Sequence, residues 1–379
     1  MAIKILLGGS PCTHWSIAKG TTRETKAEGI GWELFRNYLI AKDKFQPDIF
    51  LYENNKSASQ AIKDQIAVEL GVGIDPNARF TYINSSLVSA QNRQRFYVTN
   101  FGDIEQPKDR GILLKDILEP GAIRDQLNRD KTRTLTAGYQ TCSQRDLRMD
   151  IETNGFMGKQ GAIEPVNITK EGKSQTIKAQ YQQTSPRNII CYHSTYGASG
   201  VAEPIGWATP CEWDENGTPT NAISCADGKV YTVYMVKDGS ITIKGAQYEI
   251  DLVDGYYIIR KLTVTECCRL QTLPDDYVKA VSPSQGYKGL GNAWTAEVII
   301  HILSHALKDV PRDEELIVLS MYDGIGTGRY CLDKMGFTNV KYNAYEIDKY
   351  AMTISMDNYP DIIQHGDAFA VRNEDWRLD

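Results

Sequence analysis

Short apolar runs that end at glycine or at an acidic residue recur at both ends of this 379-residue chain, and they constrain its fold more than any other feature. Near the N-terminus the run 3–7 ends at Gly8-Gly9, and the run 47–52 ends at Glu53. Similar runs cover residues 316–322 and 340–345. Segments with helical spacing of apolar residues lie between them, and such alternation predicts an α/β fold with a doubly wound, mostly parallel sheet. Open sheets of this kind bind their ligands at the carboxyl ends of the strands.

The C-terminal part has the pattern of a nucleotide-type binding site. The run 316–322 leads into Asp323-Gly324-Ile325-Gly326-Thr327, which is followed by a helical segment and a second strand ending at Glu346. Glycines there let a ligand approach the helix N-terminus, and an acid after the second strand can accept hydrogen bonds from ribose hydroxyls. Glu346 lies roughly 20 residues beyond the loop, which is the interval expected for ribose recognition.

Cys12 follows the first strand and the Gly8-Gly9 turn, so we expect it at the carboxyl edge of the sheet. A lone cysteine in such a place is more often a small buried hydrophobe than a nucleophile. The eight cysteines form no CxxC pair, so the pattern indicates no metal site and no disulfide framework. No apolar stretch approaches the ~20 residues of a membrane span, and the N-terminus lacks a signal-peptide pattern. We therefore expect a soluble, intracellular protein without a membrane partner.

The middle of the chain differs from both ends. From about residue 105 it is rich in Gly, Asn, Gln, Thr and Tyr with short β-like runs, such as 230–236 before a Lys-Asp-Gly turn. Residues 121–190 carry 11 basic against 7 acidic side chains, although the whole chain has a net charge of −6. A near-repeat of 131–140 at 173–182 predicts two polar hairpins, which suit either phosphate and base-edge contacts or a plain solvated surface. We divide the chain into residues 1–104, 105–260 and 261–379.

Taken together, these segments resemble the cytosine-5 DNA methyltransferase family, with its motifs in a rotated order. The matching segments are Gly9-Ser10-Pro11-Cys12 (catalytic loop), Glu53-Asn54-Asn55 (ENV), Gln91-Asn92-Arg93-Gln94-Arg95 (QxRxR), 262–277, Gly291-Asn292-Ala293 (GN), Tyr322-Asp323-Gly324-Ile325-Gly326, Glu346-Ile347-Asp348 and Gly366-Asp367. The last three usually open the chain, so the resemblance implies a circular permutant whose break lies between the third motif and the catalytic strand. Asn55 and Tyr322 replace the usual valine and phenylalanine.

The resemblance implies a Rossmann-like methyltransferase sheet with an inserted, smaller β-rich target-recognition domain at 105–260. It implies methyl transfer from S-adenosylmethionine to carbon 5 of a flipped-out cytosine in double-stranded DNA, through a covalent cysteine adduct. The implied catalytic residues are Cys12 (nucleophile), Glu53 (ring nitrogen 3), and Arg95 with Arg93 (the base oxygen and the loop). The implied cofactor residues are Pro11, Asn292, Ala293, Tyr322, Asp323, Gly324, Ile325, Gly326, Thr327, Glu346, Ile347 and Asp367.

Several alternatives stay open at this point. An RNA cytosine-5 methyltransferase could use the same scaffold, although Thr13-His14-Trp15-Ser16 does not resemble the RNA-directed catalytic loop. A catalytically silent DNA-binding protein of the same fold is a second alternative. For Arg93, and less so for Arg95, an ordinary surface salt bridge is an alternative to a functional role. We expect a cytoplasmic monomer of a bacterial or phage-infected cell, in which Ile17 or Ala18 fills the gap left by the flipped base.

Overall fold

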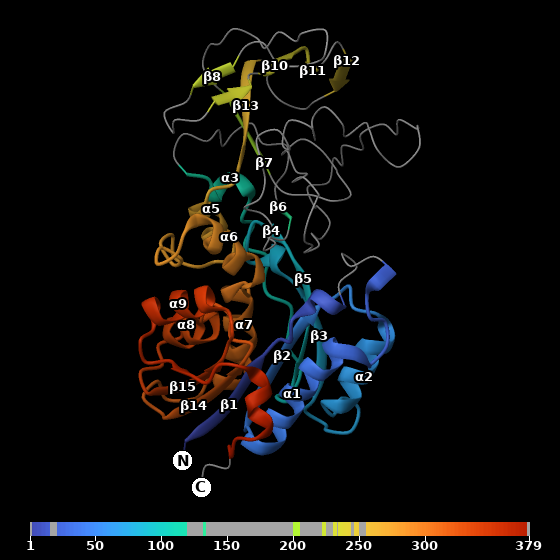
Figure 1. The fold of residues 1–379 in the computed structure, drawn as a ribbon, viewed down its shortest axis with the longest axis vertical. Helices are drawn as coiled ribbons and strands as arrows, with labels where there is room; N and C mark the ends of the chain where they lie inside the picture. The colour runs from blue at the N-terminus through green and yellow to red at the C-terminus, as the bar shows by residue number, and fades with distance from the viewer. Residues whose placement is uncertain are drawn as a thin grey trace.

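A seven-stranded sheet of order β16-β15-β14-β1-β2-β5-β3 forms the centre of the structure (Figure 1). The computed structural model describes residues 2–15, 21–119, 132–133, 200–204, 222–224, 230–232, 234–243, 246–249 and 255–376. Strands β16 to β2 run parallel, whereas β5 is antiparallel to both β2 and β3. The strands are β1 (Ile3–Gly8), β2 (Ile49–Asn55), β3 (Arg79–Asn84), β5 (Gln94–Thr99), β14 (Leu316–Met321), β15 (Val340–Tyr345) and β16 (Ile363–Gln364).

Helices cover both faces of this sheet, as a doubly wound fold requires. Successive residues of a strand point to opposite faces, so Ile5 and Leu7 pack with α7 and α8, while Leu6 packs with α1 and α2. Each fully buried leucine or isoleucine of this kind contributes about 1.5–3 kcal/mol. The helices are α1 (Gly29–Phe45), α2 (Gln60–Glu69), α3 (Leu114–Ile117), α5 (Val264–Leu270), α6 (Pro283–Asn292), α7 (Ala296–Leu307), α8 (Thr327–Lys334) and α9 (Lys349–Asn358). The short 3-10 turns are η1 (Cys12–His14), η3 (Ser85–Leu87) and η5 (Ala368–Arg372).

A second, antiparallel sheet of order β12-β11-β10-β13-β7 lies beyond α3 and α5, away from the first sheet (Figure 1). The predicted Lys-Asp-Gly turn is confirmed, because Asp238 and Gly239 both have positive φ and join β10 to β11. The near-repeat, Ile17 and Ala18 lie outside the described residues, apart from Thr132 and Arg133. The remaining strands are β4 (Gln91–Asn92), β6 (Thr132–Arg133), β7 (Gly200–Pro204), β8 (Ala222–Ser224), β9 (Val230–Thr232), β10 (Tyr234–Lys237), β11 (Ser240–Ile243), β12 (Ala246–Glu249) and β13 (Gly255–Lys261).

The sequence predicts that the glycine-rich segment 289–294 opens a long helix that runs to Leu307. This prediction is wrong, because residues 289–292 form the last turn of a separate helix, α6. The glycines serve close packing there, because a Cβ on Gly289 would lie 2.9 Å from Cγ2 of Ile325. Glycine therefore marks a close helix contact at this position, and α7 begins only at Ala296.

Two further features concern the molecule as a whole. The N- and C-terminal ends lie side by side at the amino ends of the parallel strands (Figure 1). Lys44 of α1 holds the last segment in place, since its ammonium donates to the carbonyl oxygens of Val371, Arg372 and Glu374 at 2.8–3.0 Å. Within the part of the chain described above, none of the helices combines the length and the apolar character needed to cross a membrane.

Candidate active site

A cavity of about 430 Å³ opens where the parallel strands β1, β2, β14 and β15 end. Its lining comes from both ends of the chain, from Gly9 on one side to Phe369 on the other. Cys12 starts η1 between the lining residues Pro11 and Thr13, but its side chain is not among those that the structure describes. The predicted site residues that line the cavity are Pro11, Glu53, Arg93, Arg95, Asn292, Ala293, Tyr322, Asp323, Gly324, Ile325, Thr327, Glu346, Ile347 and Asp367.

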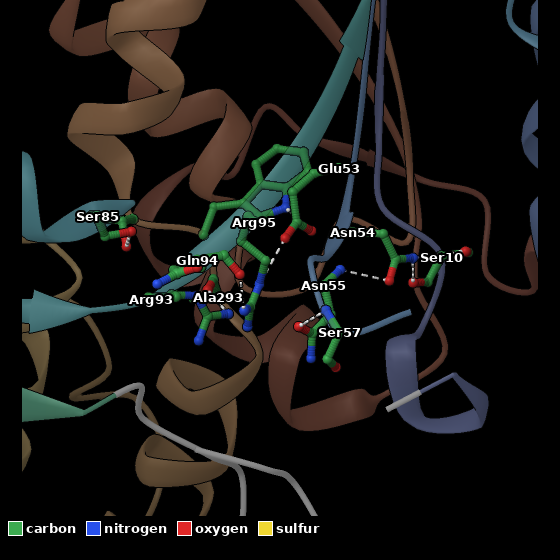
Figure 2. Close-up of polar contacts among 12 residues, drawn as sticks. Ser10, Glu53, Asn54, Asn55, Ser57, Ser85, Arg93, Gln94, Arg95 and Ala293 are labelled. Atoms are coloured by element: carbon green, nitrogen blue, oxygen red, sulfur yellow. Dashed lines mark hydrogen bonds and ion pairs between the residues drawn. The ribbon is translucent and has the colours of Figure 1, made fainter. Parts of the chain in front are cut away.

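Glu53 is the one acidic residue of β2, and its carboxylate contacts two nitrogen donors. The Nε of Arg95 lies 2.9 Å from its Oε1, and the indole Nε1 of Trp294 donates to its Oε2 at 3.2 Å. Figure 2 shows Arg95 reaching Glu53 from the neighbouring strand β5. Arg95 is 6% exposed and Glu53 is 9% exposed, so this ion pair is shielded from water and is not a surface salt bridge. The pair fixes a carboxylate at one end of the cavity.

Arg93, which was predicted to hold the base oxygen and the loop together with Arg95, has other hydrogen-bond partners than Arg95. Its Nη2 donates to the carbonyl of Ala293 at 2.9 Å, and its Nη1 donates to that of Gly291 at 3.4 Å. The side chain is only 4% exposed, so the surface salt bridge considered for it is also excluded. Arg93 thereby connects the segment before β5 to the last turn of α6, which includes Asn292, and to Ala293 just after it.

The loop after β1 is fixed by a buried polar network. Asn54 Nδ2 donates to the carbonyl of Ser10 at 2.9 Å (Figure 2). The hydroxyls of Ser10 and Tyr52 lie 2.7 Å apart. Burial raises the pKa of Tyr52 well above its usual value, so its hydroxyl stays neutral. Gly9 has no room for a side chain, since a Cβ there would lie 2.9 Å from Oε2 of Glu53. The path of this loop therefore depends on glycine.

At the other end of the cavity, the carboxylate of Glu346 organises the glycine loop. Its Oε2 accepts from the amide of Gly324, and its Oε1 accepts from the amides of Ile347 and Asp348, all at 2.8 Å. Gly324 adopts φ 65°, a conformation that glycine reaches without strain. Gly326 differs from the prediction: it does not line the cavity, and a Cβ on it would lie 2.9 Å from Cβ of Ser355. Gly326 permits close packing between α8 and α9.

Asp323 is a buried acid in the wall of the cavity. Burial raises its pKa to about 6, although hydrogen bonds from Ser320 and Tyr342 to its Oδ1, each at 2.7 Å, oppose this shift. The nearby charge of Glu346 adds to the rise. Its Oδ2 is buried without a hydrogen-bond partner among the described residues. Such an atom favours a ligand that can donate a hydrogen bond.

Tyr322 and Ile347 present apolar surface to the same space. Tyr322 has φ 62°, which is uncommon for a non-glycine residue, and its hydroxyl donates to the carbonyl of Leu34 at 2.7 Å. Ile347 is 74% exposed although it is a large aliphatic residue. Asp367 and Asn292 are exposed beside them. Lys288 and Asp348, which also line the cavity, form an ion pair of 2.6 Å between α6 and α9.

A family model of the C-5 cytosine-specific DNA methylases matches residues 1–308. The chain belongs to this family. The resemblance inferred from the motifs is therefore confirmed, and so is the methyltransferase fold class. The match ends before β14, and residues after 308 form strands of the same sheet and line the same cavity as the matched residues.

Individual relatives of this methylase were also found. Over 383 residues the chain is 24% identical to the orphan methyltransferase M.SPRI of Bacillus phage SPR, covering 80% of this chain and 82% of that protein. Among solved structures, the Entamoeba histolytica methyltransferase EhMeth aligns with a TM-score of 0.40 and 10% identity, over 81% of this chain and 78% of that one. A mutant DNMT2 of Spodoptera frugiperda aligns with a TM-score of 0.35 and 14% identity, over 79% and 78% of the two chains.

Trp294 is a site residue that the sequence motifs did not reveal. It follows the Gly291-Asn292-Ala293 segment directly, and its indole ring lines the cavity while it donates to Glu53. The position next to a motif was the only signal in the sequence that could have pointed to it. Its hydrogen bond fixes the position of one oxygen of the Glu53 carboxylate.

Proposed function

We propose that the protein is a DNA cytosine-5 methyltransferase that uses S-adenosylmethionine and acts on a cytosine extruded from double-stranded DNA. The observation that carries this proposal is the single cavity, in which Glu53 and Arg95 line one part and Gly324, Glu346 and Asp367 line another. A shared cavity of this kind allows a base and a methyl donor to meet. Membership in the DNA methylase family supports DNA as the substrate.

The residues of the glycine-loop end fit S-adenosylmethionine. Asp323 Oδ2 and Thr327 Oγ1 are buried polar atoms without partners in the described structure, and both residues line the cavity. Glu346 would hold the ribose hydroxyls with carboxylate lone pairs left over from its three amide bonds. Ile347 and Tyr322 would pack against the adenine, Asp367 would accept from the adenine amino group, and Asn292 would contact the methionine end. When bound, the cofactor supplies an electrophilic methyl group.

The base end of the cavity would activate the cytosine. The Cys12 thiolate adds to carbon 6, and the electrons of the 5,6 double bond make carbon 5 nucleophilic. Glu53, in its protonated form, would donate a hydrogen bond to ring nitrogen 3 as negative charge develops there, and Arg95 would hold the base oxygen beside it. Each oxygen of Glu53 accepts one of these bonds and keeps a second lone pair, so the base can approach the carboxyl group without displacing Trp294 or Arg95. Methyl transfer would leave S-adenosylhomocysteine. Water would then accept the proton of carbon 5, and the electrons of the broken carbon–hydrogen bond would restore the 5,6 double bond while the carbon–sulfur bond breaks and releases the Cys12 thiolate.

The target base must leave the helix, because a nucleophile cannot reach carbon 6 of a stacked cytosine. Extrusion costs a few kcal/mol, which contacts in the pocket offset. Part of that offset would come from the buried Glu53–Arg95 pair, whose charges are shielded from bulk water.

The decisive experiment measures methyl incorporation and identifies its product. Purified protein is incubated with labelled S-adenosylmethionine and either unmethylated plasmid DNA or transfer RNA, and the DNA is then sequenced after bisulfite treatment. We expect incorporation into DNA and a defined set of protected cytosines. Incorporation into transfer RNA alone would establish the RNA alternative.

The covalent step is tested by Cys12→Ala, which should abolish methyl transfer while leaving DNA affinity nearly unchanged. Cys211→Ala, outside every motif, is the matched control and should stay active. Substantial transfer by Cys12→Ala would contradict the assigned mechanism.

A further inference from the structure

Two lysine ammonium groups converge on one tyrosine ring near the base end of the cavity. Lys56 follows β2 directly, Lys63 lies on α2, and Tyr82 lies on β3. The Nζ atoms of the two lysines lie 5.4 Å and 5.6 Å from the centroid of the Tyr82 ring. We call Lys56, Lys63 and Tyr82 the lysine cluster. An aromatic face attracts cations, and this arrangement holds two positive charges within about a Debye length of each other.

The charges of the lysine cluster are not neutralised by any carboxylate of the described residues. Lys56 Nζ donates to Oε1 of Gln94 at 2.7 Å, and Lys63 Nζ donates to the carbonyl of Lys56 at 3.4 Å. By contrast, Lys288 and Lys341 each lie 2.6 Å from an acidic side chain. Two ammonium groups that share one ring repel each other, so an anion bound between them would be favoured.

Arg23 extends the positive region. Its Nη1 donates to the carbonyl of Ser57, the residue after Lys56, at 3.3 Å. Thus three cations lie near the end of β2, and their charged groups donate hydrogen bonds to neutral oxygen atoms.

The lysine cluster adjoins the residues that would receive the base. Lys56 directly follows Asn55, which lines the cavity, and its partner Gln94 lies between the lining residues Arg93 and Arg95. Figure 2 shows Gln94 beside Arg93 and Arg95, with Asn55 and Ser57 on the adjacent strand end. An extruded nucleotide stays covalently attached to its strand, so its flanking phosphates must pass close to the mouth of the cavity.

We propose that Lys56 and Lys63 bind the phosphate backbone of the DNA strand that carries the target cytosine. This inference rests on the proposed function and adds a site to it. The contact is electrostatic and involves no base edge, so it contributes affinity and register without sequence preference. Tyr82 keeps both ammonium groups in place before the DNA arrives, and this lowers the entropy lost when the contact forms.

The test compares wild-type protein with the double variant Lys56→Gln/Lys63→Gln. The affinity for a labelled DNA duplex containing the site identified by bisulfite sequencing is measured from 50 to 200 mM salt. Each lost phosphate contact reduces the slope of log affinity against log salt by about 0.9, so we expect a reduction of about 1 to 2. Between 50 and 200 mM salt the wild type should therefore lose roughly ten times more of its DNA affinity than the variant loses. The methylated sequence and the affinity for S-adenosylmethionine should stay unchanged.

The control is Lys308→Gln/Lys341→Gln, which removes the same charge where α7 ends and β15 begins, at the opposite edge of the sheet. It should leave the salt slope unchanged, and Lys56→Arg/Lys63→Arg should restore it. An unchanged slope in the glutamine variant, with a wild type that still methylates DNA, would overturn the phosphate site and leave the proposed function standing. A wild type that methylates no DNA would overturn both.

Discussion

At the scale of single residues, the buried carboxyl group of Asp323 makes the stability of the protein depend on pH. Its pKa of about 6 in the folded protein lies above the ordinary value of 3.8, chiefly because it is buried. The folded state therefore binds the proton more tightly than the unfolded chain between these two values. The contribution of Asp323 to stability is complete below pH 4, and it is lost as the pH rises to about 6. The loss amounts to roughly 3 kcal/mol at most.

Replacing this acid tests the effect directly. Asp323→Asn removes the charge but keeps an oxygen that can accept from Ser320 and Tyr342, so we expect the cofactor-free protein to gain about 1–3 kcal/mol at pH 7. The measurement is the free energy of unfolding in urea from pH 4 to pH 7, where the variant should show a weaker decline than the wild type. Asp348→Asn is the matched control, and it should lower the free energy of unfolding at pH 7. Partial burial raises the pKa of Asp348, but Lys288 and the backbone amides of Tyr350 and Ala351 outweigh this and hold the pKa below its usual value. If the free energy of unfolding declines equally with pH in the wild type and in Asp323→Asn, Asp323 is not the cause of the decline.

At the scale of elements, the structure shows which of two threonines caps the start of α5. Either Thr263 or Thr265 could cap this helix on sequence grounds. Thr263 is the cap, since its hydroxyl accepts from the amide of Glu266 at 3.1 Å and Glu266 Oε2 accepts from the amide of Thr263 at 2.8 Å. Glu266 is fully buried, and its Oε1 also accepts from the amide of Glu119. The cap therefore fastens α5 to the segment that follows α3.

The two threonines form a matched pair for mutation. Thr263→Ala should destabilise the protein by about 1 kcal/mol, because one amide of the first turn loses its partner. Thr265→Ala lies inside the helix, where alanine is favoured, and should change stability by less than about 0.5 kcal/mol. Thermal melting of both variants checks this expectation, which fails if the two variants lose the same stability.

At the scale of the whole molecule, the sequence predicted the sheet and the cavity far better than the contacts inside it. Parallel strands share one carboxyl edge, so Glu53 and Glu346 had to approach each other once both strands were recognised. The bonds from Arg93 to Gly291 and Ala293 and from Trp294 to Glu53 join segments far apart in the chain. No local pattern encodes such pairs, because they depend on the three-dimensional path of loops.

Circular permutation of the family order stays a prediction from the motifs, and the neighbouring chain ends make it testable (Figure 1). A reordered chain that starts at Asp313, joins Asp379 to Met1 through a short glycine linker and ends at Arg312 restores the usual motif order. Breaks at surface loops are generally tolerated, so this chain should fold and should methylate the same cytosines as the original. Bisulfite sequencing compares the two proteins. A folded but inactive reordered chain would contradict the expected equivalence of the two orders.

The pairing of β1 with β14 has a consequence for how the protein is made. Ile3 lies beside Leu316 in the sheet, so the central pair joins segments from opposite ends of the chain. During translation the first strand leaves the ribosome long before its partner exists, and its apolar side chains have no sheet to join on that side. The reordered chain would deliver β14 before β1, so a nascent molecule of that design should spend less time dependent on chaperones.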